Sequence, residues 1–120
     1  MTKTLSILVP VYNEEKTILE IFRQVEKAEL SLNKEIVIIN DGSTDKSESI
    51  IRDYLKNTKS DKKTSFKFIT KENEGKGSAI KKGLEEATGD FIIIQDADLE
   101  YDPKEMSNDR HGNLLQVGSF

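Results

Sequence analysis

The chain has no cysteine, no long apolar run and only two prolines among its 120 residues. Without cysteine it can form neither a disulfide nor a thiolate metal site. No stretch approaches the roughly 20 consecutive apolar residues that a membrane-spanning helix needs, and the first residues lack the apolar core of a signal peptide. We therefore expect a cytoplasmic protein that is at most peripheral at the cytoplasmic face of a membrane.

An excess of basic residues is also missing. The chain has 18 lysines and arginines against 22 acidic residues, and its formal net charge is −4. The lysines are scattered among acids and form no basic run, so the sequence predicts no nucleic-acid partner. The length and the balance of apolar and charged residues are typical of one globular domain.

Four short apolar runs supply the strand signals, and each lacks the alternation of a strand exposed on one face. These runs are Leu5–Val11, Glu35–Asn40, Phe66–Thr70 and Phe91–Gln95. Between them lie three segments with apolar residues at helical spacing. Their apolar positions are Ile18, Phe22, Val25 and Ala28; Ile50, Ile51, Tyr54 and Leu55; and Ala79, Ile80, Gly83, Leu84 and Ala87. The alternation predicts a Rossmann-like α/β fold, with a mostly parallel sheet of about four strands and helices on both faces.

Cap and boundary signals complete the predicted organisation. Asn13 and Thr44 stand where caps of the first and second helices are expected. The pattern breaks near Pro103, because a helix-start signal there is followed by no apolar stripe. We therefore expect a domain over residues 1–103 and a divergent tail over residues 104–120.

A polar cluster follows each predicted strand. The four clusters are Tyr12–Glu14, Asp41–Ser43, Asn73–Gly75 and Asp96–Asp98. The carboxyl ends of parallel strands meet at one edge of the sheet, where the ligands of such folds bind. Four clusters at the same edge therefore predict a binding site.

The strongest chemical signal is the segment Asp96-Ala97-Asp98-Leu99-Glu100. In an extended chain its three acids point to the same side. Oxygen ligands at this spacing suit Mg²⁺ or Mn²⁺, which complete their coordination with phosphate and water. Paired carboxylates would repel a free diphosphate, so a diphosphate at this place requires a cation. The alternative is an acidic turn exposed to solvent.

The other clusters allow both a binding and a structural interpretation. Asp41 could accept a hydrogen bond from a base N–H or a ribose hydroxyl, or could only build a turn. Tyr12 could stack on a base and Glu14 could accept from it, or the segment could be a capped helix start. Lys76 lies near a helix N-terminus, which is unfavourable for a cation unless an anion binds there.

Two common phosphate-binding motifs are excluded around Lys76. Gly77 follows the lysine where a P-loop has serine or threonine, and Ile80 occupies the third glycine position of a dinucleotide fingerprint. Taken in order, however, the segments Pro10–Glu14, Asn40–Asp45, Asn73–Gly77 and Gln95–Glu100 resemble the motifs of family 2 glycosyltransferases of GT-A fold. The similarity is greatest to polyprenyl-phosphate (dolichol-phosphate) mannosyl- or glucosyltransferases.

This resemblance implies roles for individual residues. The implied nucleotide and diphosphate contacts are Pro10, Tyr12, Glu14, Asp41, Lys76, Asp96 and Ala97, and the implied metal ligands are Asp98 and Glu100. The implied cofactor is Mn²⁺ or Mg²⁺, and the implied donor is a GDP- or UDP-linked sugar. No catalytic base is identified.

The family implies inverting transfer of a hexosyl group to an acceptor such as polyprenyl phosphate, with a metal stabilising the diphosphate. Such transferases are normally longer, so we expect a chain truncated to the N-terminal, nucleotide-binding half of the GT-A domain. Its function is then that of a transferase, of a non-catalytic module that binds nucleotide and metal, or of a fragment that self-associates as a homo-oligomer through an uncovered sheet edge. A receiver-type signalling domain fits less well, because no aspartate stands directly after the predicted strand that ends at Thr70.

Overall fold

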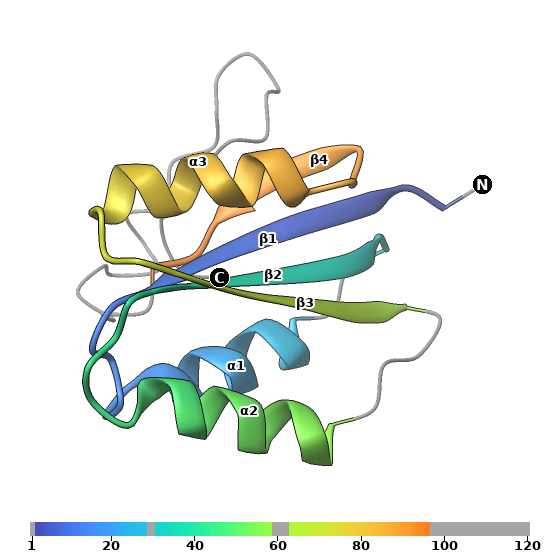
Figure 1. The fold of residues 1–120 in the computed structure, drawn as a ribbon. Helices are drawn as coiled ribbons and strands as arrows, with labels where there is room; N and C mark the ends of the chain where they lie inside the picture. The colour runs from blue at the N-terminus through green and yellow to red at the C-terminus, as the bar shows by residue number, and fades with distance from the viewer. Residues whose placement is uncertain (1, 29–30, 59–62, 97–120) are drawn as a thin grey trace.

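The computed structural model describes residues 2–28, 31–58 and 63–96 and arranges them in three layers (Figure 1). A parallel sheet forms the middle layer, helices α1 and α2 cover one face, and helix α3 covers the other. The strands are β1 (Thr4–Val11), β2 (Asn33–Asp41), β3 (Thr64–Lys71) and β4 (Phe91–Ile94), and the helices are α1 (Ile18–Lys27), α2 (Ser47–Asn57) and α3 (Lys76–Glu86). The predicted α/β fold with helices on both faces is confirmed.

The four-stranded sheet has the order β3-β2-β1-β4. Strand β1 pairs with β2 along its whole length and with β4 from Leu5 to Leu8, always in parallel. Strands β2 and β3 therefore follow β1 on one side of the sheet, and β4 is added on the other side of β1. In open parallel sheets, a ligand binds where the strand order reverses in this way.

The two central strands are apolar on both sides because both faces of the sheet are covered. In β1, Ile7 and Val9 pack among the residues of α1 and α2, whereas Leu8 packs toward α3. In β2, Ile38 and Ile39 divide between the two faces in the same way, and all of these side chains are fully buried. Continuous Ile, Leu and Val runs are the expected sequence of such strands.

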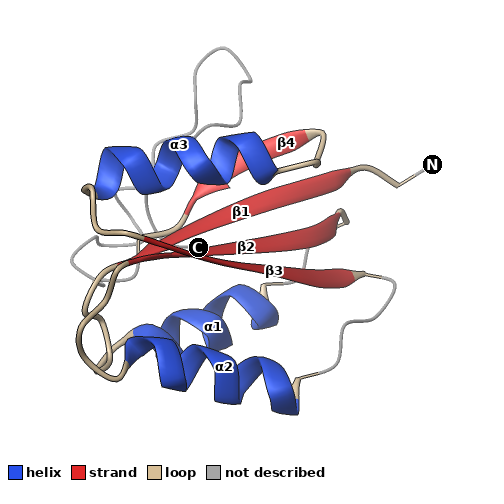
Figure 2. Cartoon of the chain, in the orientation of Figure 1, coloured by secondary structure: helices blue, strands red, loops and turns tan. Residues whose placement is uncertain are grey.

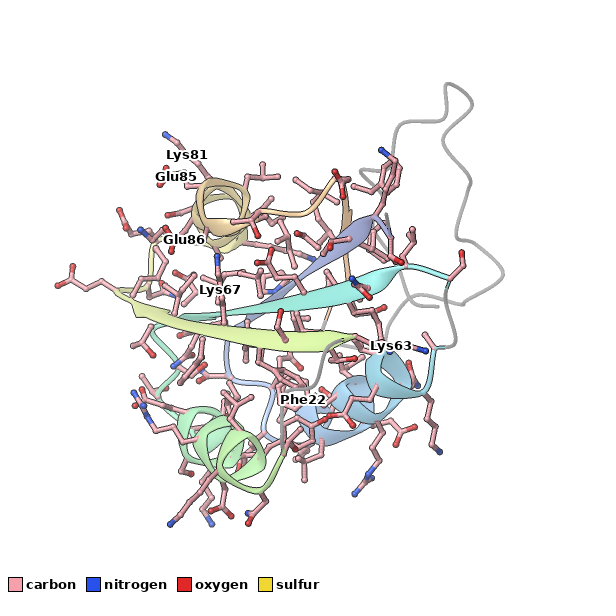
Figure 3. All side chains as sticks on the ribbon, turned by 90° about the vertical axis from the view of Figure 1, so that its right-hand side faces the viewer. Phe22, Lys63, Lys67, Lys81, Glu85 and Glu86 are labelled. Atoms are coloured by element: carbon pink, nitrogen blue, oxygen red, sulfur yellow. The ribbon has the colours of Figure 1, made fainter. Side chains whose placement is uncertain are left out.

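Helix α1 has the clearest amphipathic stripe, in which Ile18, Ile21, Phe22 and Val25 are buried. The Phe22 ring lies between α1 and the sheet (Figure 3) and stacks obliquely on Tyr54 of α2, with ring centroids 4.6 Å apart. Tyr54 meets Phe66 of β3 edge-on, with centroids 6.2 Å apart. These rings join α1, α2 and the β3 edge into one core, in geometries that aromatic pairs prefer.

Helix α3 packs on the opposite face through small residues, since Ala79 and Gly83 are its buried positions. A Cβ added at Gly83 would lie 2.8 Å from Ile39 Cδ1 and 3.2 Å from Leu8 Cδ1. The glycine therefore lets the helix approach β1 and β2 closely. Lys81 and Glu85 lie on the outer side of the helix (Figure 3).

Replacing Gly83 by valine should destabilise the fold by about 1–3 kcal/mol, because a branched side chain cannot fit between α3 and the sheet. The matched control is Gly77→Ala in the same helix, where an added Cβ meets nothing within 4 Å. That change should be neutral or stabilising by up to about 1 kcal/mol, since alanine is the better helix former. Urea unfolding measures both, and an unchanged midpoint for Gly83→Val would contradict the close packing.

Two predicted helix caps and one predicted core position are wrong. Helix α1 begins at Ile18, after Thr17, so Asn13 lies too far upstream to cap it. Helix α2 begins at Ser47, and its first N–H donates to Asp45 Oδ1 at 2.8 Å and not to Thr44. Leu84 of α3 is 40% exposed, because the small residues of the stripe carry the contact with the sheet.

Two charged side chains are buried at the amino end of β2. The Lys34 ammonium donates to three backbone oxygens at the end of α1, those of Val25, Glu26 and Ala28, at 2.9 to 3.0 Å. It thus caps carbonyls that the helix itself leaves unsatisfied, at the end where the helix dipole favours a cation.

Glu35 is the second buried charge and lies on the α3 side of the sheet. Its carboxylate accepts from Ser6 Oγ at 2.7 Å and from the Thr88 amide and hydroxyl at 2.8 and 2.7 Å. Lys67 of β3 reaches the same carboxylate at 3.4 Å, and its ammonium donates to the Glu86 carbonyl at the end of α3 (Figure 3). These contacts join three strands to the α3–β4 connection.

None of the helices in the described residues is long and apolar enough to cross a bilayer. The predicted boundary at residue 103 and the tail over residues 104–120 lie outside the described residues.

Candidate functional site

The loops that leave β1, β2 and β3 all lie at the carboxyl edge of the sheet, where Figure 2 draws them in tan. A pocket of about 240 Å³ opens at this edge. Residues from all four strand ends line it: Pro10, Val11, Tyr12, Glu14, Asp41, Asn73, Gly75, Lys76, Ala79 and Asp96. The structure thus brings together the clusters that the sequence places at this edge.

Six of the predicted site residues line this pocket, namely Pro10, Tyr12, Glu14, Asp41, Lys76 and Asp96. The other three, Ala97, Asp98 and Glu100, lie outside the described residues. The part of the site that the structure describes is therefore the wall next to β1, β2 and α3, together with the first acid of the Asp96–Glu100 segment.

Tyr12 and Glu14 extend one wall of the pocket beyond the end of β1. Tyr12 is 47% exposed, so its ring is open to a ligand. The Glu14 carboxylate accepts from the Thr17 hydroxyl at 3.1 Å, and its backbone oxygen accepts from the first turn of α1. Tyr12 therefore offers a ring for stacking, while Glu14 also anchors the start of the helix.

Asp41, at the end of β2, accepts four hydrogen bonds through its carboxylate and is only 2% exposed. Oδ1 accepts from Lys71 Nζ at 2.9 Å and from the Glu74 amide at 3.1 Å. Oδ2 accepts from the Gly75 amide at 2.9 Å and from Asn73 Nδ2 at 3.2 Å. Both oxygens of the carboxylate thus shape the loop between β3 and α3.

These contacts also fix the protonation state of the pair. Burial by itself would raise the pKa of Asp41, but hydrogen bonds from Lys71, Glu74 and Gly75, together with the Lys71 charge, outweigh it and lower this pKa. The same carboxylate, with that of Glu74, raises the pKa of Lys71 against the opposing effect of its desolvation. The pair is charged at neutral pH.

The close approach of two loops beside Asp41 requires a glycine. Gly42 has a φ of 71°, and a Cβ there would lie 2.6 Å from the Asn73 amide nitrogen. A side chain at this position would therefore push the Asn73 loop away from the end of β2.

Lys76 and Asp96 form an ion pair at the wall of the pocket. Lys76 is the first residue of α3, and its ammonium pairs with the Asp96 carboxylate that follows β4. The Asp96 side chain is 8% exposed, whereas the Lys76 side chain is 45% exposed. Lys76, which the sequence predicts to meet an anion at a helix N-terminus, therefore has an anionic partner within the protein. Its side chain also remains accessible to solvent.

The structure tests only part of the predicted metal site. In the part of the chain that the structure describes, no three acidic or histidine side chains gather closely enough to hold a metal ion. Asp96 supplies one buried carboxylate at the pocket wall, and its oxygen chemistry suits a hard divalent cation. Asp98 and Glu100, which would complete the set, lie outside the described residues.

Several residues of the site were not singled out from the sequence. Lys71 and Asn73 hold the Asp41 carboxylate, and Ala79 forms part of the pocket floor on α3. Asn73 belongs to a recognised polar cluster, but nothing in the sequence shows that it bonds to the end of β2. The pocket combines an exposed ring with an ammonium group at a helix N-terminus, which suits a ligand with a flat base and an anionic group.

Comparison with protein families gives a match to the model described as “Glycosyl transferase family 2” over residues 6–108. That range includes β2, β3, β4, all but the first two residues of β1, and every residue of the pocket.

Curated relatives have related descriptions. The chain is 37% identical over 103 residues to an undecaprenyl-phosphate 4-deoxy-4-formamido-L-arabinose transferase of Pseudomonas aeruginosa, a match that covers 84% of this chain and 30% of that protein. It is 33% identical over 119 residues to a dolichol-phosphate mannosyltransferase of Pyrococcus furiosus, covering 95% of this chain and 32% of the relative. The chain thus spans about a third of the length of these relatives.

Solved structures share the fold. The mannosyltransferase PcManGT from Pyrobaculum calidifontis, in complex with GDP-Man and Mn²⁺, superposes with a TM-score of 0.72 at 25% identity, over 84% of this chain and 29% of that one. S. aureus TarS 1–349, in complex with UDP-GlcNAc, gives a TM-score of 0.66 at 30% identity, over 82% of this chain and 27% of that one.

Proposed function

This chain belongs to glycosyl transferase family 2, and from that premise we propose that it binds the nucleoside-diphosphate sugar of a glycosyltransferase. The observation that carries the proposal is the pocket at the carboxyl edge of the sheet, to which four strand ends contribute. The Tyr12 ring would stack on the base, and Lys76 would meet the diphosphate. One structural neighbour was solved with GDP-Man and another with UDP-GlcNAc, so the proposal includes both bases.

We further propose that the site uses Mn²⁺ or Mg²⁺, with Asp98 as the principal ligand and Glu100 as a second one. Support comes from the order of acids after β4 in the sequence and from the Mn²⁺ in one structural neighbour. A bound divalent cation would offset the charge of the diphosphate leaving group. Asp96 would remain beside it at the pocket wall, held by Lys76.

We propose the transfer reaction for a full-length transferase of the relatives' size, of which this chain would be the nucleotide-binding part. Their descriptions name undecaprenyl phosphate and dolichol phosphate, so we propose a polyprenyl phosphate as the acceptor. We also propose that the sugar is transferred with inversion, as the resemblance to the family implies. Incubation of this chain with labelled GDP-mannose or UDP-glucose and a polyprenyl phosphate tests whether it transfers sugar alone. Labelled lipid product would show that it does, and labelled nucleotide sugar recovered unchanged would limit it to binding.

The binding proposal predicts metal-dependent nucleotide affinity. GDP or UDP should bind the chain tightly only when Mn²⁺ or Mg²⁺ is present, and Asp98→Ala should weaken this binding by about 10- to 100-fold. Asp109→Ala, another acid outside the motif, is the matched control and should bind as the parent does. Calorimetric titration measures all three proteins, and equal affinities for Asp98→Ala and the parent would refute the metal assignment.

A further inference from the structure

Asn13 stands out in the backbone, because it is the only non-glycine residue with positive φ in the part of the chain that the structure describes, at 52°. Asparagine tolerates this left-handed conformation better than most residues. The conformation turns the chain sharply just after β1, between the pocket residues Tyr12 and Glu14. Asn13 itself does not line the pocket.

The Asn13 side chain instead bonds to the loop that follows β2. Its Oδ1 accepts from the Thr44 amide at 2.8 Å and from the Asp45 amide at 3.2 Å. Its own amide donates to Ser43 Oγ at 3.0 Å. Asn13 therefore makes three hydrogen bonds, each with a backbone amide as donor, to three successive residues of the neighbouring loop.

Two further bonds continue this contact along the chain. The Glu14 amide donates to Ser47 Oγ at 2.8 Å, and the Glu15 amide donates to Asp45 Oδ2 at 3.2 Å. All five bonds join the segment after β1 to the segment after β2. The first segment carries Tyr12 and Glu14, and the second directly follows Asp41 at the end of β2, so the bonds join two walls of the pocket.

The second loop is held on its other side as well. Asp41 organises the Asn73–Gly75 loop, and Gly42 lies against the Asn73 amide. Asn13 therefore makes three of the five bonds that tie the Tyr12 wall to an assembly already fixed to α3. If Asn13 Oδ1 were removed, the Thr44 and Asp45 amides would lose their acceptor and would donate to water. Within the described residues, the Asn13 side chain makes no hydrogen bond through another atom that would hold the turn in place.

We propose that Asn13 is a positioning residue, which sets the Tyr12 wall of the pocket at its binding distance from the Asp41 wall without touching the ligand. This role rests on the proposed function, because it needs a nucleotide to bind between the walls. Preorganised walls bind more tightly, since the cost of ordering them is met during folding.

Three variants test this role. Asn13→Gly keeps the positive φ and removes the acceptor, Asn13→Asp keeps both, and Ser43→Ala removes only the partner of the Asn13 amide. GDP and UDP are titrated with Mn²⁺, and the one that binds the parent more tightly is used throughout. Titration in about 0.5 M salt screens the extra charge of Asn13→Asp. Amide exchange at Thr44 and Asp45 and thermal unfolding are measured without nucleotide.

We expect Asn13→Gly to lose protection at both amides and to bind about tenfold more weakly, with an unfolding midpoint close to that of the parent. Asn13→Asp should restore the protection and bring the affinity within about threefold of the parent. Ser43→Ala should weaken binding by about threefold, and it decides the question if Asn13→Gly fails to fold.

Parent-like affinity in Asn13→Gly and Ser43→Ala would overturn the positioning role. Weaker binding in Asn13→Asp despite protected amides would also overturn it. If the parent binds neither nucleotide with Mn²⁺, the proposed function fails and this role fails with it, whatever the amides show.

Discussion

Replacing Asp41 by alanine should lower the free energy of unfolding by about 3 kcal/mol and abolish measurable nucleotide binding. The carboxylate is almost fully buried and holds four donors, three of them in the loop between β3 and α3. Its removal would leave the Glu74 and Gly75 amides without their acceptor and Lys71 without its nearest anion. The estimate is at the low end for a broken buried pair, because Lys71 keeps Glu74 at 3.1 Å.

The effect of Asp41 on binding should act largely through the loop. A carboxylate has about four acceptor sites, and the four donors of the protein fill them. A base N–H could bond to Asp41 only where one of these donors gives way. The base contact predicted from the sequence therefore stays a prediction, whereas the structure shows the turn-building role.

Exchange of the Glu74 and Gly75 amides separates the two roles. In Asp41→Ala both amides should lose protection along with the nucleotide affinity. Asp53→Ala, which removes an exposed acid from α2, is the matched control and should change neither. An Asp41→Ala variant with parent-like stability and protected amides would contradict the structural role and leave base contact as the better explanation of its effect on binding.

Replacing Glu35 by alanine should cost about 3 kcal/mol, because the Ser6 hydroxyl and both Thr88 donors would lose a buried acceptor while a cavity remains. Glu85→Ala on the outer side of α3 is the matched control and should cost little. Urea unfolding at neutral pH measures both changes. Equal midpoints would show that the network at the amino end of the sheet contributes little to stability.

The lowered pKa of Glu35 also makes the free energy of unfolding depend on pH. Burial by itself would raise the pKa of Glu35, but hydrogen bonds from Thr88 and Ser6 and the Lys67 charge outweigh it and lower this pKa. A group whose pKa is lower in the folded state stabilises the protein above its unfolded pKa, which is about 4.3 for glutamate. This stabilisation is lost as the pH falls through the folded pKa.

The variant Glu35→Gln isolates this contribution, because it keeps the size of the side chain and removes the charge. The stability difference between parent and Glu35→Gln should be largest at neutral pH and should shrink steadily below about pH 4. Urea unfolding between about pH 7 and pH 3 measures it. A difference that is constant over this range would show that the Glu35 carboxylate does not titrate differently in the folded protein.

The strands and the faces of the helices could be predicted because burial on both sides leaves a direct pattern in the sequence. The Ile38–Ile39 run and the Ile18, Phe22 and Val25 stripe are such patterns. The sequence predicts a buried Leu84 because its spacing fits the apolar stripe of α3. In the structure Gly83 makes the close contact with the sheet, and Leu84, the next residue, faces solvent.

The positions of the pocket residues also followed from the sequence, since parallel strands place their carboxyl ends at one edge. Their partners did not. Asparagine accepts an amide N–H equally well as a helix cap or across two loops, so Asn13 carries no signal that distinguishes these roles. The donors of Asp41 lie about thirty residues further along the chain, and only the folded sheet brings them to it.

The sheet order has a consequence for how the pocket is assembled. Strands β1, β2 and β3 join by two successive crossovers of similar length, but β4 reaches β1 only by closing a loop that contains almost the whole described chain. Longer loops cost more entropy to close and slow the contacts that depend on them. We therefore expect a nascent chain to form the Tyr12 and Asp41 walls before β4 brings Asp96 to the pocket, so that the wall beside Lys76 is completed last.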